Sequence, residues 1–243
     1  MRRHLEEANH DLLYQIEVAQ ELIGSTTVPG VLTPYVGRLL QMCAVLRQQA
    51  LHNLKILDYG VDDTLPDVLA RTQGLTELFE LVSTRLTSPI TRAKPTDRLA
   101  LLFLQWLHDL IPETAGFPYA LTDGVFGVYS SSHIPPIYSV PVTRQTTLLY
   151  LPLLFHEFGH VLYQVHRQEM DELVKEFQTT VRACLTPRTI PDGRSATQGK
   201  SFRRRVETIW FAWVQEFFCD AVGNNNWWAG ILESLLSLFS NSF

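Results

Sequence analysis

The sequence predicts a mainly helical α+β protein, and three observations lead to this fold class. Apolar residues recur at helical spacing over residues 1–112 and again from residue 151 onward. Between these stretches, residues 116–142 are rich in Gly, Ser, Pro and β-forming residues and lack that spacing. The chain of 243 residues is 46% hydrophobic, which is enough to bury a substantial core.

Four helices are expected in the N-terminal region. Two of them are predicted by apolar stripes, which consist of Leu12, Ile16, Ala19 and Ile23 and of Leu39, Leu40, Cys43, Leu46 and Leu51. A third helix should begin at Thr64–Leu65–Pro66, because proline fits the first turn of a helix. A fourth should begin at Thr96–Asp97, a pair able to cap the apolar run that follows.

The middle of the chain predicts a small antiparallel sheet. Its candidate strands are Val125–Ser130 and Ile137–Val142, with Pro141 at an edge or a bulge because proline cannot donate a ladder hydrogen bond. The change in composition near residue 115 separates an N-terminal helical region, 1–115, from a second region, 116–243. The two regions could also form one continuous unit.

Helical patterns return in the C-terminal part, over residues 151–168, 171–183 and 201–223. Residues 186–200 carry two prolines and two glycines and predict a surface loop. The apolar tail predicts a last buried helix over 228–239.

Composition narrows the possible partners and the compartment. The net charge is −5, so no excess of Lys and Arg suggests nucleic acid, and Arg203–Arg205 are expected to be solvated at a helix start. No apolar run reaches 18 residues, which argues against a membrane partner. The N-terminus lacks a signal-peptide core, and three unpatterned cysteines fit a reducing compartment, so a cytoplasmic location is expected.

The pattern that carries chemistry is His156-Glu157-Phe158-Gly159-His160. Four residues advance a helix by about 400°, so the two histidines share one face and can bind a single metal ion. Zn²⁺ is the expected cofactor, because imidazole is one of its preferred ligands and a tetrahedral site can keep one position for water. Glu157 can then take a proton from that water without being a ligand, which makes it the expected general base.

A purely structural explanation competes with this one, in which His156 and His160 are hydrogen-bonded core histidines and Glu157 is a paired buried acid. The surrounding residues are apolar and predict an almost wholly buried helix. Burying two histidines and a glutamate there without a metal would carry a high desolvation cost. The sequence therefore favours the metal site.

Two residues compete to be the third metal ligand. His166 extends the pattern to HExxHxxxxxH, but Tyr163 occupies the position where a glycine would let the helix turn, so His166 falls on another face. Glu216 lies on a later predicted helix, with Asp220 one turn further on the same face. Glu216 is preferred over His166 and over three further acids, Glu169, Glu172 and Glu207.

HExxH followed by a glutamate and, four residues later, an aspartate resembles the gluzincin branch of the zincin metallopeptidases. The resemblance covers roughly residues 125–222 and matches five positions: His156, Glu157, His160, Glu216 and Asp220. It implies a zincin-like catalytic domain in which Asp220 orients a ligating histidine through its second ring nitrogen. It also implies that the strand at Val125–Ser130 aligns the substrate backbone by strand addition. HExxH with His166 instead resembles the metzincins, but Met170 is too close to form their later Met-turn.

The expected activity is hydrolysis of peptide bonds in a peptide or protein substrate by zinc-activated water. A donor to the developing oxyanion is also needed, and Tyr138, His133 and Tyr163 are its candidates. Only 23 residues follow Asp220, so the substrate groove could be shallow or the chain truncated. The alternatives are a zinc-binding regulatory or protein-interaction module without catalysis, and a helical interaction module without metal.

Overall fold

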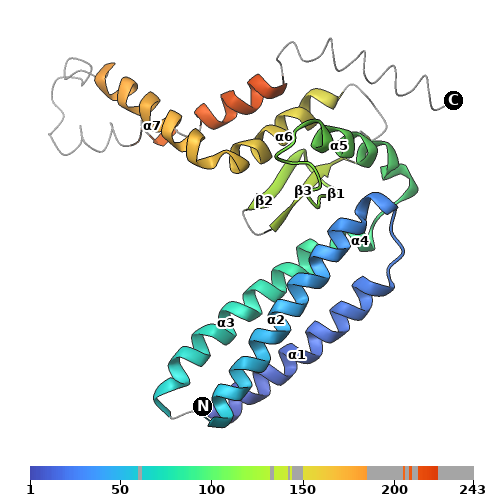
Figure 1. Ribbon diagram of the computed structural model, residues 1–243, viewed down its shortest axis with the longest axis vertical. Helices are drawn as coiled ribbons and strands as arrows, with labels where there is room; N and C mark the ends of the chain where they lie inside the picture. Colours follow the sequence, from blue (N-terminus) through green and yellow to red (C-terminus); the bar gives the residue numbers. More distant parts are fainter. Residues whose placement is uncertain are drawn as a thin grey trace. The chain divides into compact units, whose positions relative to one another are not determined.

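The computed structural model describes residues 1–59, 62–131, 134–141, 143, 150–184, 205, 208, 209 and 213–223. The chain divides into two compact units, Met1–Thr146 and Thr147–Phe243. This division falls later than the boundary at residue 115 expected from composition. The sheet therefore belongs to the same unit as the N-terminal helices (Figure 1).

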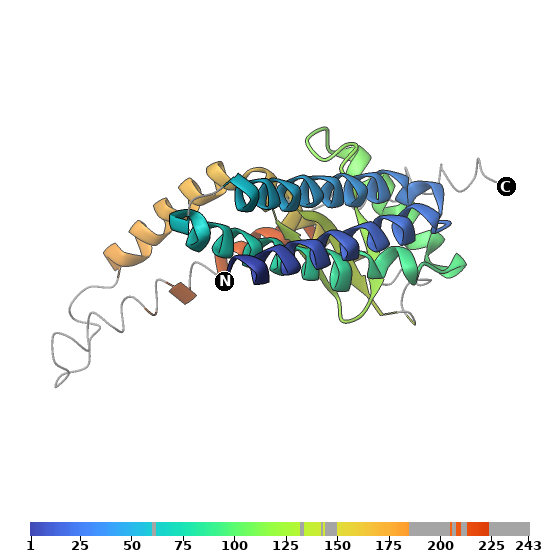
Figure 2. The same ribbon diagram turned by 90° about the horizontal axis from the view of Figure 1, so that it is seen from below.

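Three long helices form most of the first unit: α1 (Arg2–Ser25), α2 (Thr33–Tyr59) and α3 (Leu65–Leu81). They lie side by side in both views of the ribbon (Figures 1 and 2). Most residues of the two predicted stripes are buried, namely Leu12, Ile16, Ile23, Leu39, Cys43 and Leu46. The third helix begins at Leu65 with Pro66 in its first turn, as predicted.

A polar layer inside this bundle links all three helices. Asn9 of α1, Asn53 of α2 and Thr72 of α3 are almost fully buried. The Asn9 side-chain amide donates to Thr72 Oγ1 at 3.0 Å, and the Asn53 amide donates to Asn9 Oδ1 and Thr72 Oγ1 at 3.3 Å. Each of the three residues thus has a hydrogen-bond partner within the layer, which offsets part of the cost of its burial.

Two 3₁₀ turns, Gly30–Leu32 and Asp62–Thr64, join the three bundle helices to one another. Between α3 and the sheet come a π-helix at Val82–Leu86, α4 (Ser88–Thr91), a 3₁₀ turn at Pro95–Asp97 and α5 (Arg98–Leu110). Asp97 precedes α5 as expected, but its carboxylate accepts the backbone N–H of Lys94 at 2.7 Å instead of capping α5.

The sheet has three strands, β1 (Ala120–Asp123), β2 (Gly127–Ser131) and β3 (Ile134–Val140), in the order β1-β3-β2. β2 pairs antiparallel with β3, but β1 pairs parallel with it, so the predicted purely antiparallel sheet is wrong. The chain reverses direction between β1 and β2 and again between β2 and β3. β3 therefore runs parallel to β1, and it lies between β1 and β2 in the sheet. β1 was not predicted, because its four residues are too short for an alternating pattern.

The two predicted strands correspond to β2 and β3 with shifted ends. Val125 lies outside β2 and is exposed, while Pro141 follows directly after β3. β2 is an edge strand, as expected for Val125–Ser130. The alignment of a substrate by this strand stays a prediction.

α5 packs on the sheet through a buried histidine. His108 stacks on Tyr119 with ring centroids 4.7 Å apart, and its Nε2 lies 3.0 Å from the Tyr138 hydroxyl. Burial lowers the pKa of His108 to about 4, because the charged imidazolium is poorly solvated there. His108 is therefore neutral at ordinary pH.

The second unit contains α6 (Leu151–Val165), α7 (Arg167–Cys184) and a helix over residues 213–223. The predicted helix over 151–168 ends at Val165. The helical conformation is interrupted at His166, and a separate helix, α7, begins at Arg167. The predicted loop over 186–200, the predicted helix over 228–239, and Arg203 and Arg204 lie outside the described residues.

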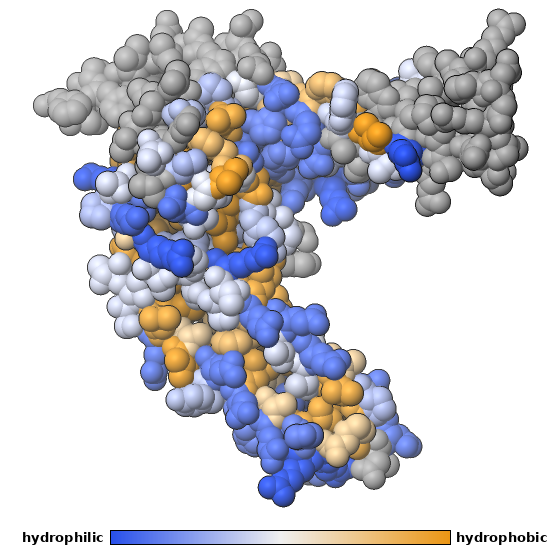
Figure 3. Space-filling view, turned by 180° about the vertical axis from the view of Figure 1, so that it is seen from behind, coloured by the Kyte–Doolittle hydropathy of each residue, from blue (hydrophilic) through white to orange (hydrophobic). Residues whose placement is uncertain are grey.

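In the part of the chain that the structure describes, no helix combines the length and the apolar composition needed to cross a bilayer. Figure 3 shows hydrophobic residues in patches between hydrophilic ones on the visible face of the molecule. Two of the cysteines, Cys43 and Cys219, are buried and free.

Candidate metal centre

The two histidines of the HExxH motif lie on successive turns of α6. This helix begins at Leu151 with Pro152 in its first turn, as the sequence predicts. The side chains of His156 and His160 are each 20% exposed. Their rings are 5.1 Å apart between centroids and stand at 80° to one another, so both are presented on one face of the helix.

Glu216 on the 213–223 helix meets both histidines. Its Oε2 lies 3.3 Å from His156 Nε2 and 3.9 Å from His160 Nε2. One potential ligand atom from each of the three residues lies within 4.8 Å of the others. The preferred third ligand of the sequence analysis is thus brought to the histidine pair.

These separations can be compared with those around a bound zinc ion. A tetrahedral zinc with bonds of about 2.0–2.1 Å holds neighbouring donor atoms about 3.3 Å apart. The contact between His156 and Glu216 has this spacing, and the contact between His160 and Glu216 is somewhat longer. Two imidazoles and one carboxylate are also a typical ligand set for catalytic zinc. The donor set therefore fits a zinc ion with one further position open.

Asp220 contacts the other nitrogen of His156. Its Oδ1 lies 2.9 Å from His156 Nδ1, which is hydrogen-bond distance. A carboxylate can only accept, so Nδ1 carries the proton and the lone pair of Nε2 is directed to Glu216 and the metal position. The outer role expected for Asp220 has the required geometry.

Helix α6 and the 213–223 helix run antiparallel and touch closely. Residue 223 lies beside 152 and 156, residue 219 beside 159, and residue 216 beside 160. At Gly159 a Cβ would lie only 2.8 Å from the Cα of Cys219, and at Gly223 it would lie 3.2 Å from the carbonyl oxygen of Pro152. Glycine at these two positions allows the two backbones to approach.

Apolar side chains also pack between α6 and the 213–223 helix. The ring of Tyr163 packs edge-on against Phe218 at 6.0 Å between centroids. Burial raises the pKa of the Cys219 thiol to about 12, and the nearby carboxylates act in the same direction. Cys219 is thus a neutral packing residue, in line with the sequence analysis, which had assigned it no ligand role.

Glu157 is buried, with 9% of its surface exposed. It follows His156 by one residue, so it projects about 100° around the helix from that histidine. It is not one of the three residues of the ligand cluster, as expected for a base that does not bind the metal.

Most of α6 is buried, as expected, but a second expectation about burial is wrong. The aromatic residues around Glu216 and Asp220 in the sequence predict that these acids are enclosed, whereas their side chains are 54% and 58% exposed. Trp213 and Phe217 are also about half exposed. α6 itself has exposed residues, including Leu153. The case for a metal therefore depends on the convergence of the donors and not on the cost of burying them.

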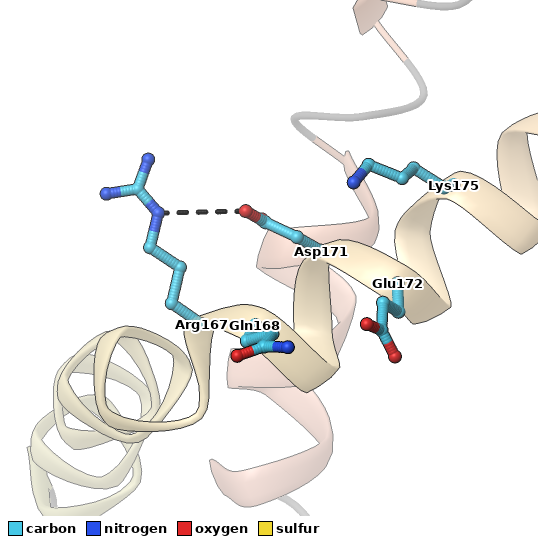
Figure 4. A pocket seen from close by; sticks show the side chains of 5 residues that line it. All are labelled: Arg167, Gln168, Asp171, Glu172 and Lys175. Atoms are coloured by element: carbon cyan, nitrogen blue, oxygen red, sulfur yellow. Dashed lines mark ion pairs between the residues drawn. The ribbon is translucent and has the colours of Figure 1, made fainter.

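The competing ligands lie elsewhere among the described residues. His166 ends α6 and pairs with Glu169 at 3.6 Å. Glu172 lines a hollow on the surface of α7, where Figure 4 shows Arg167 and Asp171 pointing toward each other across a 3.7 Å ion pair. Neither Glu169 nor Glu172 belongs to the ligand cluster, and Glu207 lies outside the described residues.

The candidates for an oxyanion donor are not gathered at the cluster by any described contact. Tyr138 lies in the first unit, where its hydroxyl contacts His108. Tyr163 packs against Phe218, and His133 lies outside the described residues. Sequence reasoning also missed the role of Gly159, although a glycine inside an apolar helical run is a signal of close packing.

Comparison of the chain with protein-family models, curated proteins and solved structures found no match. The resemblance to the gluzincins therefore depends on the five matched residues and on the geometry that four of them adopt.

Proposed function

We propose that this chain is a zinc-dependent peptidase of the gluzincin kind, acting on a peptide or protein substrate. The observation that supports the proposal is the convergence of His156, His160 and Glu216 within 4.8 Å, with Asp220 on the second nitrogen of His156. These residues come from two helices, and Glu216 follows His160 by 56 residues in the sequence.

Each residue has a distinct task in the proposed reaction. His156, His160 and Glu216 bind the metal, and Asp220 keeps the Nε2 lone pair of His156 available for it. Bound zinc would polarise the substrate carbonyl and lower the pKa of a bound water. Glu157 would be the residue that accepts the proton of the attacking water and passes it to the leaving amine.

The exposure of the site supports a catalytic metal site with one coordination position open to water, rather than a closed structural site. Both histidine side chains are 20% exposed, and Glu216 is 54% exposed, so water and a substrate can reach the donors. A structural zinc site has four protein ligands, whereas three are present in the cluster of described residues.

The experiment begins with the zinc content of protein purified without added metal, beside His160→Ala. We expect about one zinc per chain for the natural sequence and little for the variant. Cleavage of a mixture of peptides is then followed by mass spectrometry, with Glu157→Gln as the inactive control. Zinc bound without any cleavage would favour the regulatory module, and no zinc in either protein would contradict the metal site.

Without zinc, the same contacts have another explanation. A protonated His156 could donate to Asp220 from Nδ1 and to Glu216 from Nε2, at the observed 2.9 and 3.3 Å. That arrangement gives no reason for His160 to face the same carboxylate. Metal analysis of His160→Ala separates the two explanations, because only the zinc site requires the second histidine.

A further inference from the structure

The separation of the two helices at the candidate metal centre is set where Gly159 meets Cys219. Gly159 lies between the two histidines of the motif, one residue before His160. A Cβ built on it would lie 2.8 Å from the Cα, 3.1 Å from the Cβ and 3.2 Å from the Sγ of Cys219. The nearest of these atoms is backbone, so no change of rotamer can relieve the contact.

Any side chain at this position must therefore move one helix away from the other. A Cβ contact shorter than 3.0 Å is essentially never found and ordinary contact begins at 3.4 Å, so the 2.8 Å approach would have to open by a few tenths of an ångström. Metal–ligand distances in a functional site vary by only about 0.2 Å. Glu216 lies one turn from Cys219 on the helix that would move, whereas both histidines stay on α6.

We propose that Gly159 is a positioning residue for the third metal ligand: its missing side chain brings Glu216 within binding distance of His156 and His160. This inference rests on the proposed metal site. It adds to that proposal a residue that touches neither the metal nor the substrate and acts only through the helix that carries Glu216.

A second, weaker contact of the same kind lies toward the start of α6. A Cβ on Gly223 would meet the carbonyl oxygen of Pro152 at 3.2 Å and the backbone nitrogen of His156 at 3.6 Å. The neighbours here need to yield by only a few tenths of an ångström. Gly223 therefore limits the separation of the same two helices less strictly than Gly159 does. A side chain at Gly223 should have the smaller effect of the two.

The test compares three glycine-to-alanine variants of the full chain by zinc affinity, measured by competition with a chromophoric chelator. Gly159→Ala should weaken zinc binding by about 10- to 100-fold, the range typical when an orienting contact of a ligand is lost. Gly223→Ala should weaken it by several-fold. Gly74→Ala is the matched control, because Gly74 lies inside α3 and a Cβ there meets nothing within 4 Å.

A second readout separates positioning from general damage to the fold. With Co²⁺ in place of zinc, the visible absorption reports coordination geometry, and at saturating Co²⁺ we expect Gly159→Ala to lose the intensity typical of a four-coordinate site. Adding Cys219→Gly leaves the 2.8 Å contact with the Cα in place and should therefore restore little of the zinc affinity. Full restoration would show that the Cys219 side chain, and not the backbone, sets the separation of the helices. A variant that was only less stable would keep the Co²⁺ spectrum of the natural protein.

The outcomes separate this inference from the proposed function. If the natural protein binds zinc and a folded Gly159→Ala binds it equally well with the same Co²⁺ spectrum, Gly159 is not a positioning residue, although the metal site stands. If Gly159→Ala does not fold, Gly223→Ala decides, and unchanged zinc affinity there overturns the inference. If the natural protein binds no zinc, the proposed metal site fails, and this inference fails with it.

Discussion

Two groups of polar side chains join helices in this protein, and they differ in what their hydrogen-bonding groups face. In the first unit, Asn9, Asn53 and Thr72 are almost fully buried, and the two Asn amides donate to Asn9 Oδ1 and Thr72 Oγ1. In the second unit, His156, His160 and Glu216 are partly exposed and bring one potential ligand atom each within 4.8 Å of the others.

The difference shows how a structural polar layer can be told from a candidate binding site. In the bundle, the Asn9 amide and the Thr72 hydroxyl also donate to backbone carbonyls of their own helices, so the layer is satisfied by protein groups. At the histidine pair, two imidazole nitrogens face a carboxylate oxygen, and a cation is the group that satisfies such a set. The predictions below test this contrast, from the largest expected effect to the smallest.

Glu157→Gln should have the largest effect on activity. The amide cannot accept a proton, so peptide hydrolysis should fall by about 10²- to 10⁴-fold, the usual contribution of a general base. Zinc should remain near one per chain, since Glu157 is outside the ligand cluster. Initial rates and metal analysis on the same sample measure both quantities. Loss of zinc would make Glu157 a ligand, and full activity would remove it as the base.

Glu216→Ala should cause a severe loss of zinc affinity, because it removes one of three donors to the metal. His166→Ala should leave affinity nearly unchanged, since His166 pairs with Glu169 outside the cluster. Competition with a chelator measures both variants against the natural protein. The reverse order would restore the metzincin-like ligand set.

Acid should destabilise the first unit through His108. The unfolded chain protonates this residue near pH 6.5, but the pKa of the folded one is about 4, so unfolding takes up a proton between these values. The stabilisation is complete above pH 6.5 and falls by about 3 kcal/mol as the pH drops to 4. Denaturant unfolding at several pH values measures this slope. His108→Phe should flatten it, and an unchanged slope would show that other groups control it.

Asp220→Ala should weaken zinc binding or activity by about 10- to 100-fold, as loss of a carboxylate behind a ligating histidine usually does. His156 would then lose the 2.9 Å contact that holds its Nδ1 proton. Asp220→Asn is the conservative variant and keeps an acceptor, so its effect should be smaller. If Asp220→Ala behaves like the natural protein, the resemblance to the gluzincins reduces to HExxH and Glu216.

Thr72→Val should lower the stability of the bundle by about 1–2 kcal/mol, because the Asn9 and Asn53 amides lose a buried acceptor. Thr76→Val, one turn along α3 and exposed, is the matched control and should change stability little. Zinc affinity should not change in either variant. A loss of zinc with Thr72→Val would contradict the separation of the two polar groups.

The local sequence pattern was sufficient to predict the long helices and the two histidines that share one face of α6. The apolar spacing predicted α1, α2 and α6 because a helix repeats its buried face every 3.6 residues, and Pro66 predicted the start of α3. HExxH predicted two histidines on one face of a helix because four residues are about one turn. β1 and the parallel pairing were missed, since four residues carry no period and pairing partners are far apart in the chain.

The sequence by itself determined the residue types and the spacing of His156, Glu157 and His160, because these depend only on the geometry of one helix. It could propose Glu216 but not bring it to the histidines, since two helices separated by a long connection can pack in many registers. Only the tertiary structure decided that register, through the close contact of Gly159 with Cys219. It also showed that the acids are exposed, which depends on what each helix covers and not on the residues beside them in the chain.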